Sequence, residues 1–462
     1  MKVLLIRPNS IIIATPVPLG LAYVAQALRE RRGDEVTILD ARHLRLKPEA
    51  VARRAVELKP DVIGLSALSF ESRETHHLAG LLRQAVPKAK IILGGPYASA
   101  NREAVLLDPN FDAVVIGEGE ETAKELLDAF EGKGGLAEVK GIIFRENGAA
   151  RFTGPRPLIQ ELDRYLPAWD LVDPKSYFKR GGRNSENIIK TSHKTLAVFT
   201  SRGCPYGCIF CHNLFGKKFR ARSAENVIAE IAMLQERYGV KELEILDDAF
   251  NLDLDRAKAI ARGIIERKLD LKIALPNGIR GDRVDGELLD LFQAAGFYRI
   301  AFAVESGSPR IQELIHKRID LNKVKQAITE TARRGMVATG YFILGFPTET
   351  EADMQLTADF AVNSDLHVAS FFYLNPFPGT EVAKLAGRDL TDYAFADYFS
   401  ITVNLSAVPD AVLHRQCKQA YRRFYLSPRR VYRILRVAPK NPRTLLNAFY
   451  TLRLLFQDAV NS

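Results

Sequence analysis

Short apolar segments alternate with longer amphipathic segments over the first 135 residues of the chain. The short segments are rich in β-branched residues and are bounded by Gly, Pro or Asp, which is typical of buried strands. The longer segments place apolar residues three and four positions apart, the spacing of a helix that buries one face. Because alternating strands and helices form parallel sheets, residues 1–135 are predicted to form a doubly wound, Rossmann-like domain. Its strands are expected at Val3–Arg7, Val36–Leu39, Val62–Ser66, Ile91–Gly94 and Ala113–Ile116, with helices at Leu19–Arg32, Pro48–Leu58 and Glu74–Val86.

Residues 136–190 interrupt this alternation. They are rich in Gly and Pro and show no sustained period, so we interpret them as a linker. Within it, Asn147-Gly148 predicts a hairpin over Gly141–Phe152, because this dipeptide suits a two-residue turn.

A second alternating series occupies residues 191–385. Six strands with helices between them predict a partial (β/α)6 barrel of the TIM type, followed by a helical, basic C-terminal region at residues 386–462. The expected strands are Thr195–Thr200, Glu242–Leu246, Lys272–Leu275, Arg299–Val304, Thr339–Leu344 and Ser370–Leu374. The expected helices are Ala224–Tyr238, Leu254–Arg267, Gly286–Ala295, Leu321–Arg334 and Glu351–Ser364.

The composition of the 462 residues is that of a folded globular protein, with 47% apolar and 26% charged residues. This balance excludes intrinsic disorder and a disulfide-stapled miniprotein. No uninterrupted apolar stretch reaches the ~18 residues of a membrane-spanning helix. The N-terminus reads as a first strand rather than a signal peptide, so we expect a cytoplasmic protein.

The net charge of +10 resides in the C-terminal region. From His414 onward there are eleven Lys and Arg residues against one acid, Asp458. The cations interleave with aromatic residues and precede an apolar run at Leu445–Phe456. This pattern favours contact with a membrane surface, or with an apolar substrate that bears an acid, over nucleic acid. A solvated helical face, or a helical cap packed on the barrel, remains an open alternative.

Small residues mark several strand ends of the first domain. A ligand of a doubly wound sheet binds beyond the carboxyl ends of its strands, where glycine lets it approach the backbone. Ordinary turn chemistry would also place glycine there. The ends read Arg7-Pro8-Asn9, Ser66-Ala67-Leu68-Ser69, Gly94-Gly95-Pro96-Tyr97 and Gly117-Glu118-Gly119-Glu120.

Three of the four cysteines form a C-x3-C-x2-C group directly after the first barrel strand: Cys204, Cys208 and Cys211. A structural zinc ion would need a fourth ligand, and His212 adjoins Cys211 too closely to share one tetrahedral ion with it. Three thiolates on one loop suit a [4Fe-4S] cluster with one iron left open.

This cysteine motif, with an aromatic residue before its last cysteine, resembles the radical S-adenosylmethionine (SAM) superfamily. The resemblance implies that the open iron binds SAM and that the reduced cluster cleaves it to a 5′-deoxyadenosyl radical. Further motifs follow in order at the ends of later strands. For the adenine of SAM, the resemblance implies that Phe210 lies beside it and that the Gly340–Glu349 segment, with Gly345 and Pro347, packs on it. For the methionine part, it implies that Asp247 or Asp248 accepts the ammonium and that Arg280 clamps the carboxylate. Glu305 and Ser306 are expected to bind ribose. Leu246-Asp247-Asp248 departs from the Gly-Gly-Glu common in the family.

The first domain resembles the cobalamin-binding domain that precedes many radical SAM enzymes. The resemblance implies a cobalamin site built from the strand ends: Ser66, Leu68, Gly94, Gly95, Pro96, Tyr97, Gly117, Glu118, Gly119 and Glu120. The D-x-H-x-x-G signature, whose histidine ligates cobalt, is absent. His43, His76 and His77 are expected on the surface, and cobalamin is expected to bind without a histidine ligand.

Together the two resemblances imply a cobalamin-dependent radical SAM enzyme that methylates an unactivated carbon of a small molecule such as a lipid or tetrapyrrole. A flavodoxin or ferredoxin would supply the reducing electron. Radical rearrangement or cyclisation is the alternative within the class, and a non-catalytic cobalamin or iron–sulfur sensor is the alternative from another class. Extra cysteines typical of methylthiotransferases are absent from the first domain. Cys417, in the basic region, is either a structural thiol or a catalytic hydrogen donor.

Overall fold

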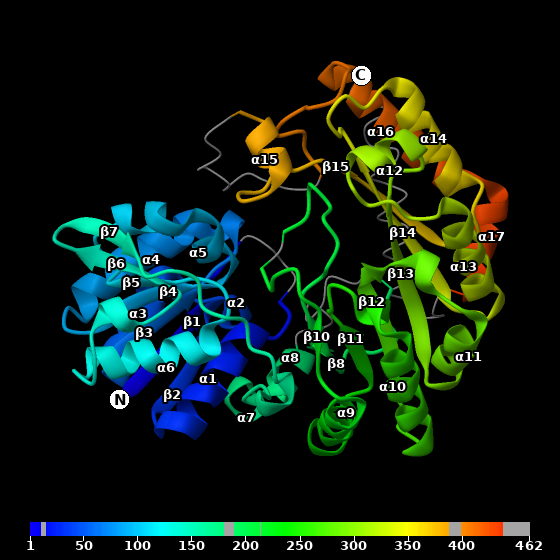
Figure 1. Ribbon diagram of the computed structural model, residues 1–462. Helices are drawn as coiled ribbons and strands as arrows, with labels where there is room; N and C mark the ends of the chain where they lie inside the picture. The colour runs from blue at the N-terminus through cyan, green and yellow to red at the C-terminus, as the bar shows by residue number, and fades with distance from the viewer. Residues whose placement is uncertain (11–14, 180–188, 213, 388–398, 438–462) are drawn as a thin grey trace. The chain divides into compact units, whose positions relative to one another are not determined.

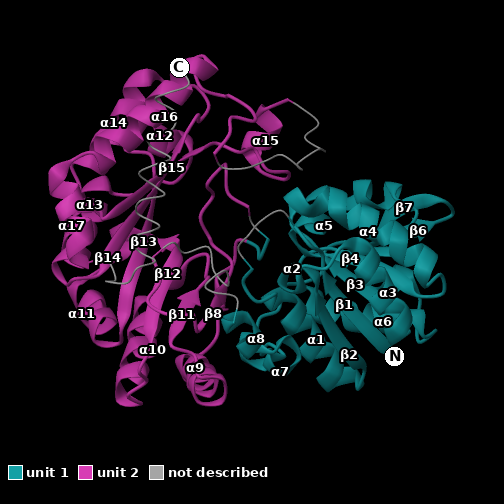
Figure 2. Ribbon diagram, turned by 180° about the vertical axis from the view of Figure 1, so that it is seen from behind, with its two compact units in different colours: residues 1–184, 213–216, 389–396 teal, residues 185–212, 217–388, 397–462 magenta. Residues whose placement is uncertain are grey.

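The computed structural model describes residues 1–10, 15–179, 189–212, 214–387 and 399–437. The chain divides into two compact units, coloured separately in Figure 2. Unit 1 comprises residues 1–184, 213–216 and 389–396, and unit 2 comprises residues 185–212, 217–388 and 397–462.

Unit 1 contains a seven-stranded sheet in the order β2-β1-β3-β4-β5-β6-β7 (Figure 1). The first five strands are parallel, which confirms the predicted doubly wound fold, and β6 and β7 add an antiparallel edge. The strands are β1 (Lys2–Arg7), β2 (Glu35–Asp40), β3 (Val62–Ser66), β4 (Lys90–Gly94), β5 (Ala113–Val115), β6 (Ile142–Glu146) and β7 (Ala149–Phe152). The helices are α1 (Leu19–Arg32), α2 (Ala41–Leu44), α3 (Pro48–Leu58), α4 (Ser72–Ala85), α5 (Gly95–Asn101), α6 (Gly119–Phe130), α7 (Trp169–Val172) and α8 (Pro174–Phe178).

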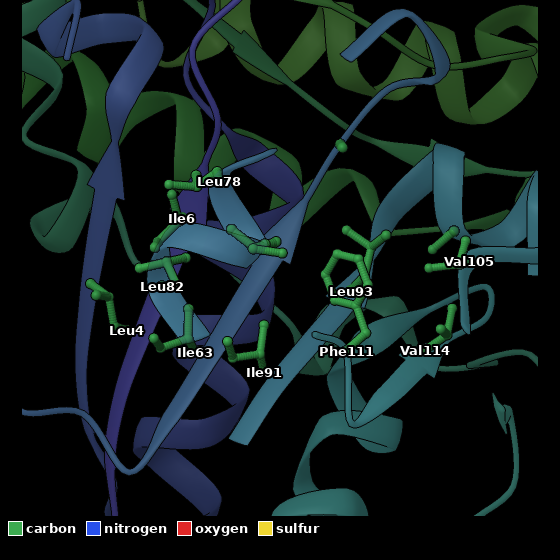
Figure 3. Close-up of a cluster of buried hydrophobic side chains, with 14 of the residues drawn as sticks. Leu4, Ile6, Ile63, Leu78, Leu82, Ile91, Leu93, Val105, Phe111 and Val114 are labelled. Atoms are coloured by element: carbon green, nitrogen blue, oxygen red, sulfur yellow. The ribbon is translucent and has the colours of Figure 1, made fainter. Parts of the chain in front are cut away.

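Two apolar cores lie on opposite faces of this sheet. Helices α3, α4 and α5 bury one face, and Figure 3 shows this cluster, with Leu78 and Leu82 of α4 above Ile63 and Ile91 of the sheet. Helices α1 and α6 bury the other face through Leu28 and Leu126. The β-branched strands are therefore covered on both sides, as a parallel sheet requires.

The segment interpreted as a linker, residues 136–190, is folded as far as it is described. Its predicted hairpin becomes β6 and β7, and β6 pairs with β5, so this segment extends the sheet of unit 1. Helices α7 and α8 follow, and Trp169 and Tyr177 are buried.

Unit 2 is built on six parallel strands in the order β15-β14-β13-β12-β11-β8. Among the described residues no further strand pairs with β8 or β15, so the row is open at both ends, which confirms the predicted partial barrel. Its strands are β8 (Thr195–Val198), β11 (Glu242–Ile245), β12 (Lys272–Ile279), β13 (Phe297–Glu305), β14 (Val337–Leu344) and β15 (Val368–Tyr373), and a small ribbon joins β9 (Ser201–Arg202) to β10 (Arg220–Ala221). The helices are α9 (Ala224–Tyr238), α10 (Leu254–Glu266), α11 (Gly286–Ala294), α12 (Pro309–Leu314), α13 (Leu321–Arg333), α14 (Glu351–Val362), α15 (Glu381–Leu385), α16 (Asp410–Tyr425) and α17 (Pro428–Val437).

Helix α16 covers the free edge of β15. The Tyr421 hydroxyl accepts from the N–H of Phe371 (3.0 Å) and donates to its C=O (3.1 Å). The Tyr425 hydroxyl, one helical turn later, bonds Ala369 in the same two ways (3.1 and 2.9 Å). Two hydroxyls thus satisfy backbone groups that a further strand would otherwise pair. The helical cap considered for the basic region is therefore present up to residue 437, whereas Leu445–Phe456 lies outside the described residues.

Candidate functional site

The cysteine loop follows β8 and β9 in unit 2. Cys204 and Cys208 are half-buried, Cys211 is exposed, and all three are free thiols. Ile209 anchors the loop: it is buried, its N–H donates to the C=O of Ile315 (3.2 Å), and its C=O accepts from the N–H of Val382 (3.2 Å). The apolar cluster around Ile209 includes Phe346, which contacts the ring of Phe210 at 5.4 Å. The loop is thus held by its apolar residues, which leaves the thiols available.

The donor set fits an iron–sulfur cluster better than a single zinc ion. Zinc needs its thiolates to converge on one point at about 2.3 Å. No three Cys, His, Asp or Glu side chains converge in this way within the described part of the chain. A four-iron cluster instead takes thiolates arranged around a larger body. Burial raises the pKa of Cys208, and the nearby Lys317 ammonium opposes this rise by favouring the thiolate.

Lys317 is a residue that the sequence did not indicate. Its ammonium is buried and donates to Glu305 (2.8 Å). Burial disfavours its charge, but the negative charges of the Glu305 carboxylate and of Cys208 as a thiolate outweigh that effect and raise the pKa of Lys317. Lys317 lies in an irregular loop after α12, so no strand-end position or spacing marks it. The structure brings a cation and a carboxylate together beside the cysteine loop.

The two candidate acids after β11 lie in different environments. Asp247 is buried and accepts from the N–H of Thr200 (2.6 Å), from the hydroxyl of Ser201 (2.6 Å) and from the hydroxyl of Thr200. Burial raises the pKa of Asp247. Asp248 is exposed and accepts a bond from the N–H of Gly203, next to Cys204. Asp247 therefore fixes the strand ends, and Asp248 is the acid open to a ligand.

Arg280 is already engaged. Its guanidinium forms two bonds to Asp282 (3.0 and 2.7 Å), donates to the C=O of Lys317 (3.0 Å), and lies over the ring of Tyr206 at 4.0 Å. The residue expected to clamp a carboxylate instead ties the cysteine loop to the loop that carries Lys317.

Of the two residues expected at ribose, Glu305 is beside Lys317 but Ser306 is not open to a ligand. Ser306 is fully buried, and its hydroxyl bonds the Thr357 hydroxyl (3.1 Å) and accepts from the N–H of Ser308 (3.1 Å). This serine stabilises the start of α12.

The segment expected at adenine forms a tight turn after β14. Gly345 has φ +99°, a conformation that favours glycine, and an added Cβ would lie 3.3 Å from Leu413 of α16. Pro347 follows Phe346, the ring partner of Phe210. Glu349, a further residue that the sequence analysis did not single out, accepts from the N–H groups of Gly345 (2.6 Å) and Phe346 (3.1 Å), and burial raises its pKa to about 8.

The residues expected at cobalamin gather at the carboxyl ends of β3, β4 and β5 in unit 1, but their exposure differs. Leu68 is 38% exposed and Gly117 is exposed, while Ser66, Gly94, Gly95, Pro96 and Gly119 are half-buried. Tyr97, Glu118 and Glu120 are buried. Glu118 accepts from the N–H of Ile159 (2.9 Å), so its carboxylate holds the chain after β7. The small and apolar members of the set are those open to a bulky ligand.

Of the three histidines expected on the surface, His43 is not there. His43 is buried, stacks on Tyr177 with ring centroids 3.8 Å apart, and bonds Ser176 (2.9 Å). His76 is half-buried and hydrogen-bonded, whereas His77 is exposed as expected. The sequence could not separate them, because a lone histidine on a helix carries no signal of its partners.

Cys417 lies on α16. It is buried, its thiol approaches the C=O of Phe371 (3.8 Å), and burial raises its pKa to about 11. Since Phe371 is on the buried side of β15, this thiol faces the packing between helix and strand.

Comparisons with known proteins cover both units. The B12 binding domain family matches residues 14–127, and the radical SAM superfamily matches residues 198–361. The chain is 32% identical over 451 residues to PH0819 of Pyrococcus horikoshii, described as an uncharacterized methyltransferase, with 93% of each chain covered. It is 32% identical to the cytidylyl-2-hydroxyethylphosphonate methyltransferase of Streptomyces wedmorensis, over 83% of this chain and 81% of that protein. The fold resembles the radical SAM methyltransferase TsrM of Kitasatospora setae with cobalamin and a [4Fe-4S] cluster bound, with a TM-score of 0.72, 20% identity, and 84% of this chain and 78% of that chain covered.

Proposed function

The chain belongs to the radical SAM enzymes that carry a B12-binding domain, and from this membership we propose that it is a cobalamin-dependent methyltransferase acting on an unactivated carbon. The observation that carries the proposal is the similarity to two methyltransferases along both units at 32% identity. When bound, the cluster and SAM supply a radical that removes a hydrogen atom, and cobalamin supplies the methyl group.

Cys204, Cys208 and Cys211 hold the cluster in this proposal. Asp248 accepts the ammonium of SAM, because Asp247 is committed to Thr200 and Ser201. Lys317 binds the SAM carboxylate: in the described chain its ammonium makes one bond, to Glu305 (2.8 Å), and keeps further donors, whereas the Arg280 guanidinium is held by Asp282 and by a backbone carbonyl. The Lys317 ammonium interacts electrostatically with Cys208, so it would supply a positive charge next to the thiols that would hold the cluster.

The inner wall of the barrel indicates an apolar or aromatic substrate. Buried Phe342 and Phe371 contact Phe360 of α14 and Tyr421 of α16, so they face the helices. Side chains alternate along a strand, so Tyr341 and Phe372 face inward, where their rings are 6.0 Å apart. Phe399, which is 70% exposed, adds an edge contact to Phe372. A lipid or a tetrapyrrole suits this wall, with a flavodoxin or ferredoxin as the reductant.

The test is anaerobic turnover of the reconstituted protein with methyl-labelled SAM and candidate lipids and tetrapyrroles, followed by mass spectrometry. We expect 5′-deoxyadenosine and a labelled product that is one methyl group heavier. The triple variant of Cys204, Cys208 and Cys211 to Ala is expected to bind no iron and to cleave no SAM. A product without the label would indicate a rearrangement or cyclisation, and a wild-type protein that cleaves no SAM would indicate a sensor.

The exposed face of α17 suggests a membrane contact for the basic region. Val431, Tyr432 and Leu435 of α17, with Leu426 just before it, are 42–67% exposed within ten residues, among exposed arginines. In the described chain no helix is long and apolar enough to span a membrane, so a contact of this kind would be peripheral.

Flotation with phosphatidylglycerol vesicles tests this contact. The variant Tyr432→Asp with Leu435→Asp leaves the α16 cap intact, whereas truncation at Asp410 would also remove the tyrosines that bond β15. We expect the wild type to float and the double variant to sediment. Sedimentation of both proteins would contradict the proposed membrane contact.

A further inference from the structure

A polar chain connects helix α4 to α5, the helix that follows β4 in unit 1. Nδ1 of His76 is 2.6 Å from a carboxylate oxygen of Asp108, and Nε2 is 2.9 Å from the hydroxyl of Tyr97. The other oxygen of Asp108 accepts from the backbone N–H and the side-chain amide of Asn110 (2.9 and 2.7 Å), which fixes the carboxylate. Each bonding group of the imidazole therefore has a partner.

The imidazole ring is also set by packing. It meets the buried ring of Phe111 edge-on, with centroids 5.4 Å apart and an interplanar angle of 81°. Phe111 belongs to the apolar core of unit 1, where Figure 3 shows it beside Leu93 of β4. Packing and hydrogen bonds thus give His76 a single orientation, directed at Tyr97.

Tyr97 lies on α5, a helix of seven residues that links three strand ends. The N–H of Tyr97 donates to the C=O of Ala67 after β3 (3.0 Å), and the hydroxyl of Ser99 accepts from the N–H of Gly117 after β5 (2.9 Å). Gly95, with φ +87°, approaches the β3 loop so closely that an added Cβ would lie 2.7 Å from the hydroxyl of Ser66. So short a helix is not stable alone and depends on its surroundings.

We propose that His76 holds α5 from behind and thereby keeps the strand-end loops after β3, β4 and β5 in the arrangement that receives cobalamin. The inference rests on the proposed cobalamin site. In it, His76 is a positioning residue that acts through Tyr97, and it is not a ligand to cobalt. Tyr97, expected from the sequence to contact the cofactor, turns its hydroxyl toward His76 and is only 7% exposed.

Two substitutions test the positioning role of His76, because each replaces the imidazole by an amide that keeps only one of its two hydrogen bonds. The amide of asparagine occupies the place of Nδ1, so His76→Asn keeps the bond to Asp108 and loses Tyr97. The longer glutamine reaches the place of Nε2, so His76→Gln keeps Tyr97 and loses Asp108. His77→Ala, at the exposed neighbouring position of α4, is the matched control.

The first readout is the Kd for hydroxocobalamin, measured by equilibrium dialysis. We expect His76→Ala, His76→Asn and Tyr97→Phe to bind about tenfold more weakly than the wild type, the equivalent of one buried hydrogen bond. His76→Gln and His77→Ala are expected within about threefold of the wild type, a difference of less than 1 kcal/mol. Wild-type affinity in His76→Asn and Tyr97→Phe would overturn the inference.

The second readout needs no cobalamin. Arg102 directly follows α5, so the rate of tryptic cleavage after Arg102 in the apoprotein reports how firmly α5 is held. We expect faster cleavage in His76→Ala and His76→Asn, and the wild-type rate in His76→Gln. Equal rates in all variants would overturn the role of His76, whereas a wild-type protein that binds no cobalamin would overturn the proposed cofactor.

Discussion

Left-handed backbone is concentrated around Lys317. Glu305 has φ +65°, and His316 and Arg318, on either side of Lys317, have φ +56° and +50°. Each such conformation in a residue other than glycine costs of the order of 1 kcal/mol or more, so it persists only where the surroundings impose it. Gln312 contributes here: its side-chain amide donates to the C=O of Val304 and Ser306, and its backbone C=O accepts from the N–H of Lys317 (3.2 Å). The backbone is strained in order to deliver one buried ion pair.

Replacing Lys317 with Met should therefore weaken SAM binding. The loss of a charge-assisted hydrogen bond, worth ~1.5–3 kcal/mol, predicts a Kd for SAM roughly tenfold to a hundredfold higher. Equilibrium dialysis of the reconstituted protein measures this change, with iron content as the check that the cluster is retained. Lys323→Met, at an exposed position of α13, is the control. If the variant binds SAM with wild-type affinity, Lys317 does not bind the SAM carboxylate, and Arg280 is again the candidate.

Among the single residues of the site, the sequence predicted those whose spacing forms a recognisable motif. The three cysteines are readable because they lie within eight positions. The position of Lys317 in the site could not be predicted from the sequence, because the loop that places it beside Cys208 depends on Gln312 and on the fold of β13. For the same reason the sequence could not show that Asp282 already occupies Arg280, or that Ser306 is buried.

Among the elements, α16 replaces a strand at the edge of the barrel. Tyr421→Phe and Tyr425→Phe should each lower the stability of unit 2 by ~1–3 kcal/mol, because a backbone pair of β15 loses its partner. The thermal transition of unit 2, followed by calorimetry, measures the effect. Tyr432→Phe removes a hydroxyl from a side chain that is 67% exposed, and it should leave the transition unchanged. An unchanged transition in the Tyr421 and Tyr425 variants would mean that water replaces the hydroxyls without cost.

A buried histidine at the start of β15 makes unit 2 sensitive to acid. Nδ1 of His367 accepts from the N–H of Ala338 (3.1 Å), and burial, reinforced by Arg430 and Arg433, lowers its pKa to about 4. The unfolded chain protonates this histidine near pH 6.5 and the folded chain does not, so stability falls as the pH falls from about 6.5 to about 4. The loss approaches ~3 kcal/mol. His367→Asn keeps an acceptor at this place, so its thermal transition should change less between pH 7 and pH 5, and an unchanged slope would contradict the prediction.

The order of strands and helices was predictable because burial imposes period 2 on strands and period 3.6 on helices. The segment 136–190 was harder to interpret. Its strands are short and its Gly and Pro content is that of a connection, yet β6 finds a partner in β5, which is distant in sequence. The pairing of β6 with β5 therefore could not be predicted from the composition of the segment.

At the scale of the whole molecule, the absence of the cobalt-ligating signature leads to a spectroscopic prediction. His43 is buried against Tyr177, His76 bonds Asp108 and Tyr97, and His77 lies on the exposed side of α4. Cobalamin is therefore expected to bind without a histidine ligand from this domain. Electron paramagnetic resonance of the Co(II) state should show no nitrogen splitting from a protein imidazole, and such splitting would mean that one of these histidines leaves its described position.

The family could be predicted from the sequence, because each of the two alternating series carries its own motifs. The substrate could not, because the barrel wall from which a substrate class is proposed consists of common aromatic residues. Tyr341 and Phe372 can be assigned to the inner wall only once strand alternation shows that they point away from the helices.

The tyrosine-capped edge of β15 also sets how this part of the barrel fluctuates. The amides of Ala369 and Phe371 are protected by hydroxyls of one helix and not by a strand, so a single undocking of α16 exposes both. Their hydrogen–deuterium exchange should proceed at one common rate, matching that of α16, while the amides of β15 that face β14 exchange more slowly. The barrel would then have a seam along β15, at which its wall opens laterally before its strands separate.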